Sequence, residues 1–157
     1  MPALHHIALA CRDVEATHRF YGELLGLELV HTEVQKLRRA TVRHFFYDLG
    51  DGSSIAFFDL HGVGPEPIKT AISTDLGLPA WVNHIALRVD AARRSEVSAR
   101  LAEAGIEPAL ELDHDWCSSS YYTDPNGVLI ELCEDSPGMP REPAEAARLL
   151  ALAADEL

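Results

Sequence analysis

Two histidines and one glutamate stand where they could bind a single metal ion. Residues 6–9 and 84–87 both have the sequence HIAL, so His6 and His84 each open a copy of the same segment. Glu131 lies in an otherwise apolar run, where an unpaired carboxylate would be costly. Two imidazoles and a carboxylate form a facial ligand set that leaves coordination positions open. The pattern predicts a catalytic metal site; the alternative is a structural cluster of packed histidines and a solvated glutamate.

Both HIAL segments alternate as β-strands do. Because alternate residues of a strand share a face, His6 lies beside Ala8 while Ile7 and Leu9 point to the other side. The small neighbour leaves the imidazole uncrowded, and the branched apolar row suits packing under a helix. Each strand is therefore expected to present its histidine to a cavity.

The first copy is predicted to be a strand, a helix and three further strands. Asp13 offers an N-cap and Gly26 a stop signal for the helix. The strands are expected at residues 4–11, 27–34, 40–49 and 53–60, the last two joined by a turn at Gly50-Asp51-Gly52.

The second copy repeats this order after a linker rich in glycine and proline, residues 61–79. Its strands are expected at 81–89, 107–112, 118–124 and 128–134, with a helix from about 90 to 104. We expect one domain over 1–136, made of modules 3–60 and 80–135, and an extension, 137–157, that is helical from about 144. Leucines of the extension are expected to cover a core edge or a subunit contact: Leu149, Leu150, Leu152 and Leu157.

The internal repeat also relates Ala56 to Glu131, because each follows the last turn of its module. The four equivalent positions are therefore His6, Ala56, His84 and Glu131. Alanine supplies no ligand atom, so one coordination position would stay open, which favours a catalytic ion over a structural one. A type I turn with a bulge at Asp124-Pro125-Asn126-Gly127 would place Tyr121 opposite Glu131, where its phenol could hydrogen-bond a bound oxygen or could simply pack. Without the bulge, Tyr122 would take that face.

Counting residues outward from the turn in the same way predicts that aromatic side chains of the first module line its half of the cavity. Phe46 is expected opposite Ala56, and His44 opposite Phe58. His44 could act as an acid or base at the edge, or it could be a surface histidine. Trp116, preceded by His114 and Asp115, could form a lid or rim.

Composition narrows the classes of function. With 157 residues, 47% of them apolar, the chain can form one compact domain. A net charge of -12 argues against nucleic acid and anionic membranes as partners. No apolar run is long enough to span a bilayer, and three cysteines without a CxxC pair fit a reducing compartment. We expect a soluble, cytoplasmic protein.

These features resemble the vicinal oxygen chelate superfamily, which includes glyoxalase I, extradiol dioxygenases and bleomycin-resistance proteins. The matching residues are His6-Ile7-Ala8-Leu9, Phe20-Tyr21, Leu24-Leu25-Gly26-Leu27, Asn83-His84-Ile85-Ala86-Leu87 and the stretch from Tyr121 to Glu131. The resemblance implies an α+β fold in which two tandem βαβββ modules form a cup-shaped mixed β-sheet around a divalent metal, here with a C-terminal helix. It also implies a homodimer.

Within the superfamily, type I extradiol dioxygenases are the most similar. Their ligands match His6, His84 and Glu131, their tyrosine matches Tyr121, and they have alanine at the place of Ala56, where glyoxalase I has glutamate. The resemblance implies ring cleavage of a catechol-like aromatic with Fe(II), with Mn(II), Zn(II), Ni(II) or Co(II) as alternatives. Phe46, Phe58, Ala56 and Trp116 would contact the substrate.

One departure concerns the catalytic histidine of the extradiol dioxygenases, which falls at Ser53, so His44 or another histidine would have to substitute for it. Two other functions stay open. One is a glyoxalase-, epimerase- or thiol-transferase-type metalloenzyme, although two lysines are few for the anionic substrate of a fosfomycin-resistance enzyme. The other is a metal-free, bleomycin-resistance-like binding protein.

Overall fold

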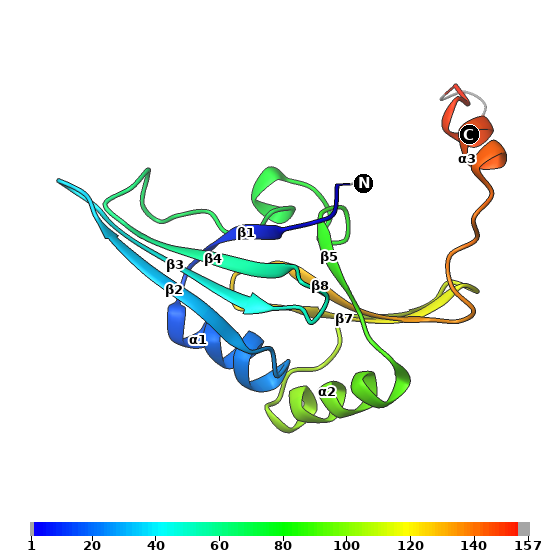
Figure 1. Cartoon of the computed structure of the whole chain (residues 1–157), viewed down its shortest axis with the longest axis horizontal. Helices are drawn as coiled ribbons and strands as arrows, with labels where there is room; N and C mark the ends of the chain where they lie inside the picture. The colour runs from blue at the N-terminus through cyan, green and yellow to red at the C-terminus, as the bar shows by residue number, and fades with distance from the viewer. Residues whose placement is uncertain (1, 154–157) are drawn as a thin grey trace.

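The computed structural model describes residues 2–153 and contains two four-stranded sheets. The strand orders are β1-β4-β3-β2 and β5-β8-β7-β6, so the two modules have the same topology. In each, one parallel pair adjoins antiparallel strands. This confirms the α+β fold of two tandem βαβββ modules (Figure 1).

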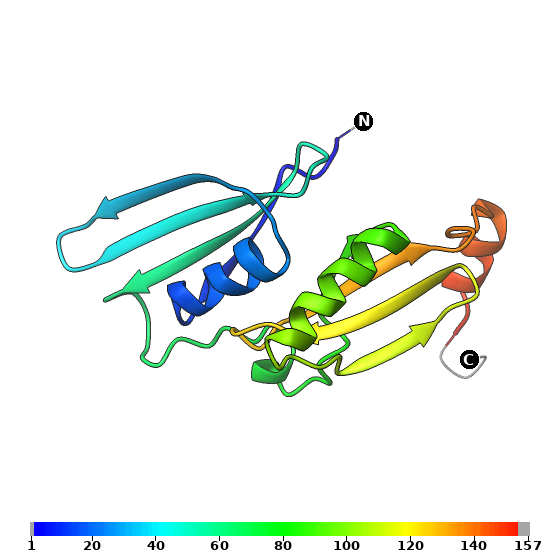
Figure 2. The same cartoon turned by 90° about the horizontal axis from the view of Figure 1, so that it is seen from below.

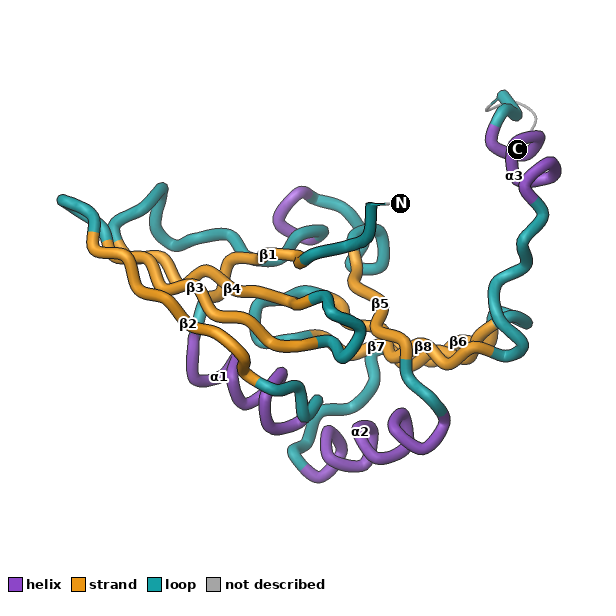
Figure 3. Tube along the Cα trace, in the orientation of Figure 1, coloured by secondary structure: helices purple, strands orange, loops and turns teal. Residues whose placement is uncertain are grey.

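The helices and strands follow the expected order, with small shifts of their ends. The first module contains β1 (His6–Cys11), α1 (Val14–His18), the π-helical η1 (Arg19–Leu24), β2 (Leu29–Lys36), β3 (Thr41–Asp48) and β4 (Ser54–His61). The remainder contains the 3₁₀ turn η2 (Thr74–Leu76), β5 (His84–Arg88), α2 (Ala91–Glu103), β6 (Leu110–Asp113), β7 (Cys117–Thr123), β8 (Leu129–Asp135) and α3 (Pro143–Leu150) (Figure 3).

Strand β6 begins at Leu110, three residues later than the pattern predicts. Pro108 has no backbone N–H to give to a neighbouring strand, and the first bond of this segment to β7 runs from the Ala109 N–H to the Tyr121 carbonyl, at 2.7 Å. The expected strand from residue 107 is therefore shortened.

The strand register confirms the internal symmetry. Ala8 of β1 pairs with Ala56 of β4, and Ala86 of β5 pairs with Glu131 of β8, both in parallel register. Ala56 and Glu131 therefore occupy equivalent positions in the two sheets.

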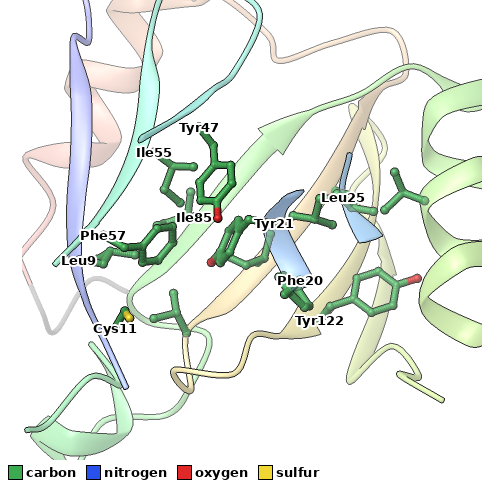
Figure 4. Close-up of a cluster of buried hydrophobic side chains, with 14 of the residues drawn as sticks. Leu9, Cys11, Phe20, Tyr21, Leu25, Tyr47, Ile55, Phe57, Ile85 and Tyr122 are labelled. Carbon is green, nitrogen blue, oxygen red and sulfur yellow. The ribbon is translucent and has the colours of Figure 1, made fainter. Parts of the chain in front are cut away.

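The first helix begins as expected at Asp13, whose carboxylate accepts the Ala16 N–H at 2.9 Å. It then widens: the Leu25 N–H reaches the Phe20 carbonyl at 2.8 Å, five residues back instead of four. The wider turn lets Phe20 and Tyr21, neighbours in the sequence, both be buried. Figure 4 shows these two rings in the core.

The hydrophobic core joins the two modules into one body. Tyr21 and Phe57 of the first module share one buried cluster with Ile85 and Tyr122 of the second (Figure 4). A buried hydrogen bond from the Tyr21 hydroxyl to the Asp124 carboxylate, 2.9 Å long, also crosses the junction.

This packing sets how the sheets lie. Figure 2 shows α1 and α2 next to each other, with the two sheets side by side. The Arg93 guanidinium of α2 donates to the Leu25 carbonyl at 2.7 Å, which holds the two helical segments together. The sheet faces that carry the histidines are therefore not stacked on each other within the chain.

Helix α3 lies away from both sheets (Figure 1). Leu149 and Leu150 are exposed, Leu150 by 88%, so they cover no core edge of this chain. Leu157 is outside the described residues. The expectation of a core edge is wrong for these two leucines, because the extended segment before α3 carries the helix away from the body. Of the helices described, none has the length and apolar character needed to cross a membrane.

Candidate metal centre

His84 and Glu131 form the best-defined part of the predicted site. His84 Nε2 lies 2.9 Å from Glu131 Oε2, and His84 Nδ1 lies 2.8 Å from the Trp81 carbonyl oxygen. A carbonyl only accepts hydrogen bonds, so Nδ1 must carry a proton. In the neutral ring, Nε2 then has its lone pair directed at the carboxylate. Two acceptors at this distance need a proton or a cation between them, as at metal sites whose histidine is oriented by a carbonyl.

Glu131 is held in place by its surroundings. Its side chain is only 7% exposed, and its Oε1 accepts the Ser119 hydroxyl at 2.5 Å. Because Ser119 holds Oε1, the oxygen directed at His84, Oε2, is the one that could bind an ion together with that histidine. Sequence analysis missed Ser119, although its position two residues before Tyr121 puts it on the same face of β7.

Tyr121 lies opposite Glu131 in the β7–β8 register, as predicted. The turn has the expected form: Gly127 has a φ of 82°, and the Asp124 N–H bonds the Val128 carbonyl at 2.9 Å. The Tyr121 ring centroid is 5.9 Å from that of His84. Burial, aided by the charge of Glu131, raises the pKa of Tyr121 to about 12. The phenol therefore stays protonated at neutral pH and can donate a hydrogen bond.

A rim borders this half of the site. The Tyr121 hydroxyl lies 3.2 Å from His114 Nε2, and the His114 ring stacks on Trp116 with centroids 5.8 Å apart. The structure thus connects His114 to the tyrosine directly and Trp116 to it through the His114 ring.

The first module presents an aromatic wall, which we define as His44, Phe46 and Phe58. His44 stacks on Phe58 with centroids 3.8 Å apart and an angle of 11°, and lies 4.1 Å from Phe46. The predicted pairings, Phe46 with Ala56 and His44 with Phe58, are confirmed. Ala56 itself is fully buried and lies on the same face of the sheet as Phe46 and Phe58.

His44 has one nitrogen engaged and one free. Nδ1 lies 3.3 Å from Glu33 Oε1, while Nε2 is buried and has no hydrogen-bond partner among the described residues. With the proton on Nδ1 facing the carboxylate, the Nε2 lone pair is available to accept a proton. The Ser53 hydroxyl donates to Asp51 Oδ1 at 2.6 Å and holds a turn.

His6 belongs to the wall side of the molecule. Its ring is exposed, lies 5.6 Å from Phe46 and makes a 2.7 Å contact between its Nδ1 and that of His5. Within the part of the chain that the structure describes, His6, His84 and Glu131 do not form a group whose ligand atoms all lie within 4.8 Å of one another. The chain alone brings together two of the three predicted ligands.

The donor set suits a divalent cation. One imidazole has its lone pair fixed by a backbone carbonyl, and one buried carboxylate faces it. A second imidazole from His6 would complete three protein ligands, the number typical of catalytic sites. The chemistry of these residues therefore fits the metal that the resemblance implies.

Comparison with known proteins agrees with this architecture. The chain belongs to the glyoxalase/bleomycin resistance protein/dioxygenase superfamily, whose family model matches residues 3–132. Among curated proteins, none matches the sequence.

Three solved structures illustrate the range of similar proteins. The fosfomycin resistance protein FosX from Listeria monocytogenes is 21% identical, with a TM-score of 0.59 over 85% of this chain and 93% of that one. The oxidase ChaP-H2 is 22% identical, with a TM-score of 0.58 over 88% and 94% of the chains. TnmS3, an antibiotic-binding protein from Streptomyces sp. CB03234, is 20% identical, with a TM-score of 0.58 over 87% and 98%. At these identities the likeness shows the fold alone.

Proposed function

We propose that this protein is a metal-dependent enzyme of extradiol ring-cleaving dioxygenase type that acts on a small aromatic with two neighbouring oxygens, such as a catechol. The observation that carries the proposal is the fixed His84–Glu131 pair beside a protonated Tyr121. A similar fold in a protein described as an oxidase is compatible with this chemistry.

His84 and Glu131, with His6, are the residues that would hold the ion. Fe(II) is the ion we propose, with Mn(II), Zn(II), Ni(II) or Co(II) as alternatives. When bound, it would supply chelation of the two substrate oxygens and a position for dioxygen beside them.

The aromatic wall supplies the binding surface for the substrate ring. Phe46, Phe58 and His44 pack against one another. A planar aromatic ligand placed against them gains both buried apolar area and stacking, worth about 1 kcal/mol for each aromatic pair beyond area burial. Trp116 at the opposite rim would cover the ligand from the second module.

Proton handling falls to His44 and Tyr121. A substrate hydroxyl reaching His44 Nε2 would find a buried, unpartnered acceptor whose other nitrogen is oriented by Glu33. The Tyr121 hydroxyl would donate to a substrate oxygen, and its raised pKa keeps the proton available. His44 thereby takes the role of the catalytic histidine that extradiol dioxygenases have at the position of Ser53.

We further propose that the cup is completed in a homodimer, by His6 and the aromatic wall of one copy with His84 and Glu131 of the other. Three features support this: the two sheets lie side by side (Figure 2), the three ligands are not together in one chain, and α3 exposes Leu149 and Leu150.

We also propose a cytoplasmic location, because the three cysteines are free thiols, as is usual in a reducing compartment.

Metal analysis tests the central claim. Protein purified without an affinity tag is expected to bind close to one iron or manganese per chain after anaerobic loading, and His84→Ala and Glu131→Ala are expected to lose it. His61→Ala is the control, since His61 is an exposed histidine paired with Asp59. Loaded wild type should consume oxygen with at least one of a panel of catechols; absence of both catechol binding and oxygen uptake would refute the proposal.

Mixed dimers test the assembly. Refolding His6→Ala together with Glu131→Ala would create one intact site in each mixed dimer, formed by the His6 of one chain and the Glu131 of the other. Recovery of metal binding to about a quarter of the wild-type level is expected, because random mixing makes about half of the dimers mixed and each of these has one intact site of two. No recovery in a preparation that size analysis shows to be dimeric would mean that each site closes within one chain.

A second candidate function is the metal-free binding of an aromatic drug. The observation that favours it is the preformed wall of Phe46, His44 and Phe58, which needs no ion, and a similar fold occurs in an antibiotic-binding protein. Aromatic ligand binding that survives chelation and the Glu131→Ala change would favour this function over the enzyme.

A further inference from the structure

Two cysteines lie beside Glu131 and have no part in the proposed reaction. Cys117 on β7 is buried, and Cys133 on β8 is partly buried. Their sulfur atoms and a carboxylate oxygen of Glu131 all lie within 4.8 Å of one another. This is the one group of three or more His, Cys, Asp or Glu residues with such spacing in the described chain.

The geometry of the pair suits a bridging cation better than a disulfide. Cys133 pairs with Ser119, and Cys117 stands two residues from Ser119 on the same face, so the cysteines are diagonal neighbours. Cα atoms of diagonal neighbours lie roughly 7–8 Å apart, beyond the usual disulfide range of about 4.4–6.8 Å. Two thiolates on one tetrahedral Zn²⁺ need sulfur atoms only about 4 Å apart, because each Zn–S bond is about 2.3 Å.

We propose that Cys117, Cys133 and Glu131 form a second cation site, selective for a thiolate-binding divalent ion such as Zn²⁺. Both thiols lose their protons to solvent as the two metal–sulfur bonds form, Glu131 supplies one oxygen, and a water completes the tetrahedron. No electron transfer is involved. Iron(II) and manganese(II) prefer the nitrogen and oxygen donors of His84 and Glu131, so the two sites differ in ion preference.

Sharing Glu131 makes the two sites compete. Its Oε2 faces His84 and its Oε1 faces Ser119, so drawing the carboxylate toward the sulfur atoms weakens the contact with His84. Zinc at the cysteines is therefore expected to reduce iron loading at the histidines. This consequence rests on the proposed function, whereas the cysteine site itself does not.

Cobalt(II) is the probe for the site, because thiolate ligation gives a near-ultraviolet charge-transfer band and tetrahedral coordination gives intense visible bands. Full-length, reduced, metal-free protein should bind one thiolate-ligated Co²⁺ that Zn²⁺ displaces. Cys117→Ser and Cys133→Ser should each weaken this binding by roughly 100-fold or more, since each removes a ligand where even loss of a supporting group costs about 10- to 100-fold.

Two matched variants complete the test. Cys11→Ser removes the third cysteine, which is buried in β1, and His84→Ala removes the histidine site; both should keep the charge-transfer band. A band that survives in both Cys117→Ser and Cys133→Ser, or that disappears with Cys11→Ser, would overturn the proposal. Retention of the band in His84→Ala alongside loss of iron binding would separate the two sites.

Folding defects are excluded with the wild-type protein. Saturating Zn²⁺ should protect Cys133 from alkylation at least tenfold, measured on its peptide by mass spectrometry, while Mg²⁺ should not. Equal alkylation rates with and without Zn²⁺ would refute the site independently of any variant.

Discussion

His84 and Glu131 are 47 residues apart in the chain, yet His84 Nε2 and Glu131 Oε2 lie 2.9 Å from each other. The parallel pairing of β5 with β8 brings them together, because it sets Ala86 opposite Glu131. The Trp81 carbonyl then fixes the proton on His84 Nδ1. The β5–β8 pair thus brings two candidate ligands together, and the carbonyl just before β5 orients the histidine.

Replacing Glu131 by glutamine is expected to weaken divalent-metal binding by at least 10- to 100-fold, because the amide brings no charge to the ion and can also place a donor toward His84. Isothermal titration with Mn²⁺ measures the effect. Glu134→Gln is the control on the same strand, since Glu134 pairs with Arg94 instead. Equal affinities for all three proteins would contradict the assignment of Glu131.

Removing the Tyr121 hydroxyl with phenylalanine is expected to lower kcat by about 100-fold while metal content stays unchanged, because the phenol acts on the substrate and not as a ligand. Oxygen uptake with the best catechol gives the rate. Tyr122→Phe is the control, since the Tyr122 hydroxyl bonds Ser98 on the helix side of the sheet. A rate reduced equally by both changes would argue against a specific role for Tyr121.

Truncating Phe58 to alanine is expected to weaken binding of planar aromatic ligands by about tenfold, because the His44 stack and one stacking surface are lost. Fluorescence titration in the presence of a chelator measures this without the metal. Leu60→Ala on the same strand is the comparison for a general loss of packing. Wild-type affinity in Phe58→Ala would place the ligand elsewhere.

The buried bond between Tyr21 and Asp124 is expected to stabilise the junction of the modules. Tyr21→Phe removes one donor to a buried carboxylate and should lower the free energy of unfolding by about 1–3 kcal/mol. Urea unfolding followed by circular dichroism provides the value. Tyr122→Phe breaks a partly buried bond to a neutral serine and should cost less.

Alkaline pH is expected to destabilise the protein through its buried phenols. Burial raises the pKa of Tyr47, and of Tyr121, to about 12, above the ordinary phenol value of about 10. Between pH 10 and 12 the unfolded phenols lose protons first, so the free energy of unfolding falls as pH rises through this window. Urea unfolding at pH 9, 10 and 11 should show the decline, reduced in Tyr47→Phe; a pH-independent difference between Tyr47→Phe and wild type would contradict it.

Local rules predicted the register around Tyr121. The turn Asp124-Pro125-Asn126-Gly127 has room for a left-handed residue only at its glycine, and this fixes which residue of β7 faces Glu131. The same counting predicted the pairing of Phe46 with Ala56 and of His44 with Phe58. The roles of His6, His84, Glu131, His44 and Tyr121 in metal binding or catalysis stay predictions.

By itself the sequence determined the repeated modules, the order of strands and helix along each module, and the faces on which candidate residues lie, because alternation and turn chemistry act over a few neighbouring residues. Only the tertiary structure decided how the modules sit relative to each other. That placement depends on contacts such as Tyr21 with Asp124 and Arg93 with the Leu25 carbonyl, which join distant segments and leave no periodic signal. The same long-range packing separates His6 from the His84–Glu131 pair, and the pairing of β7 with β8 gathers Cys117 and Cys133 beside Glu131.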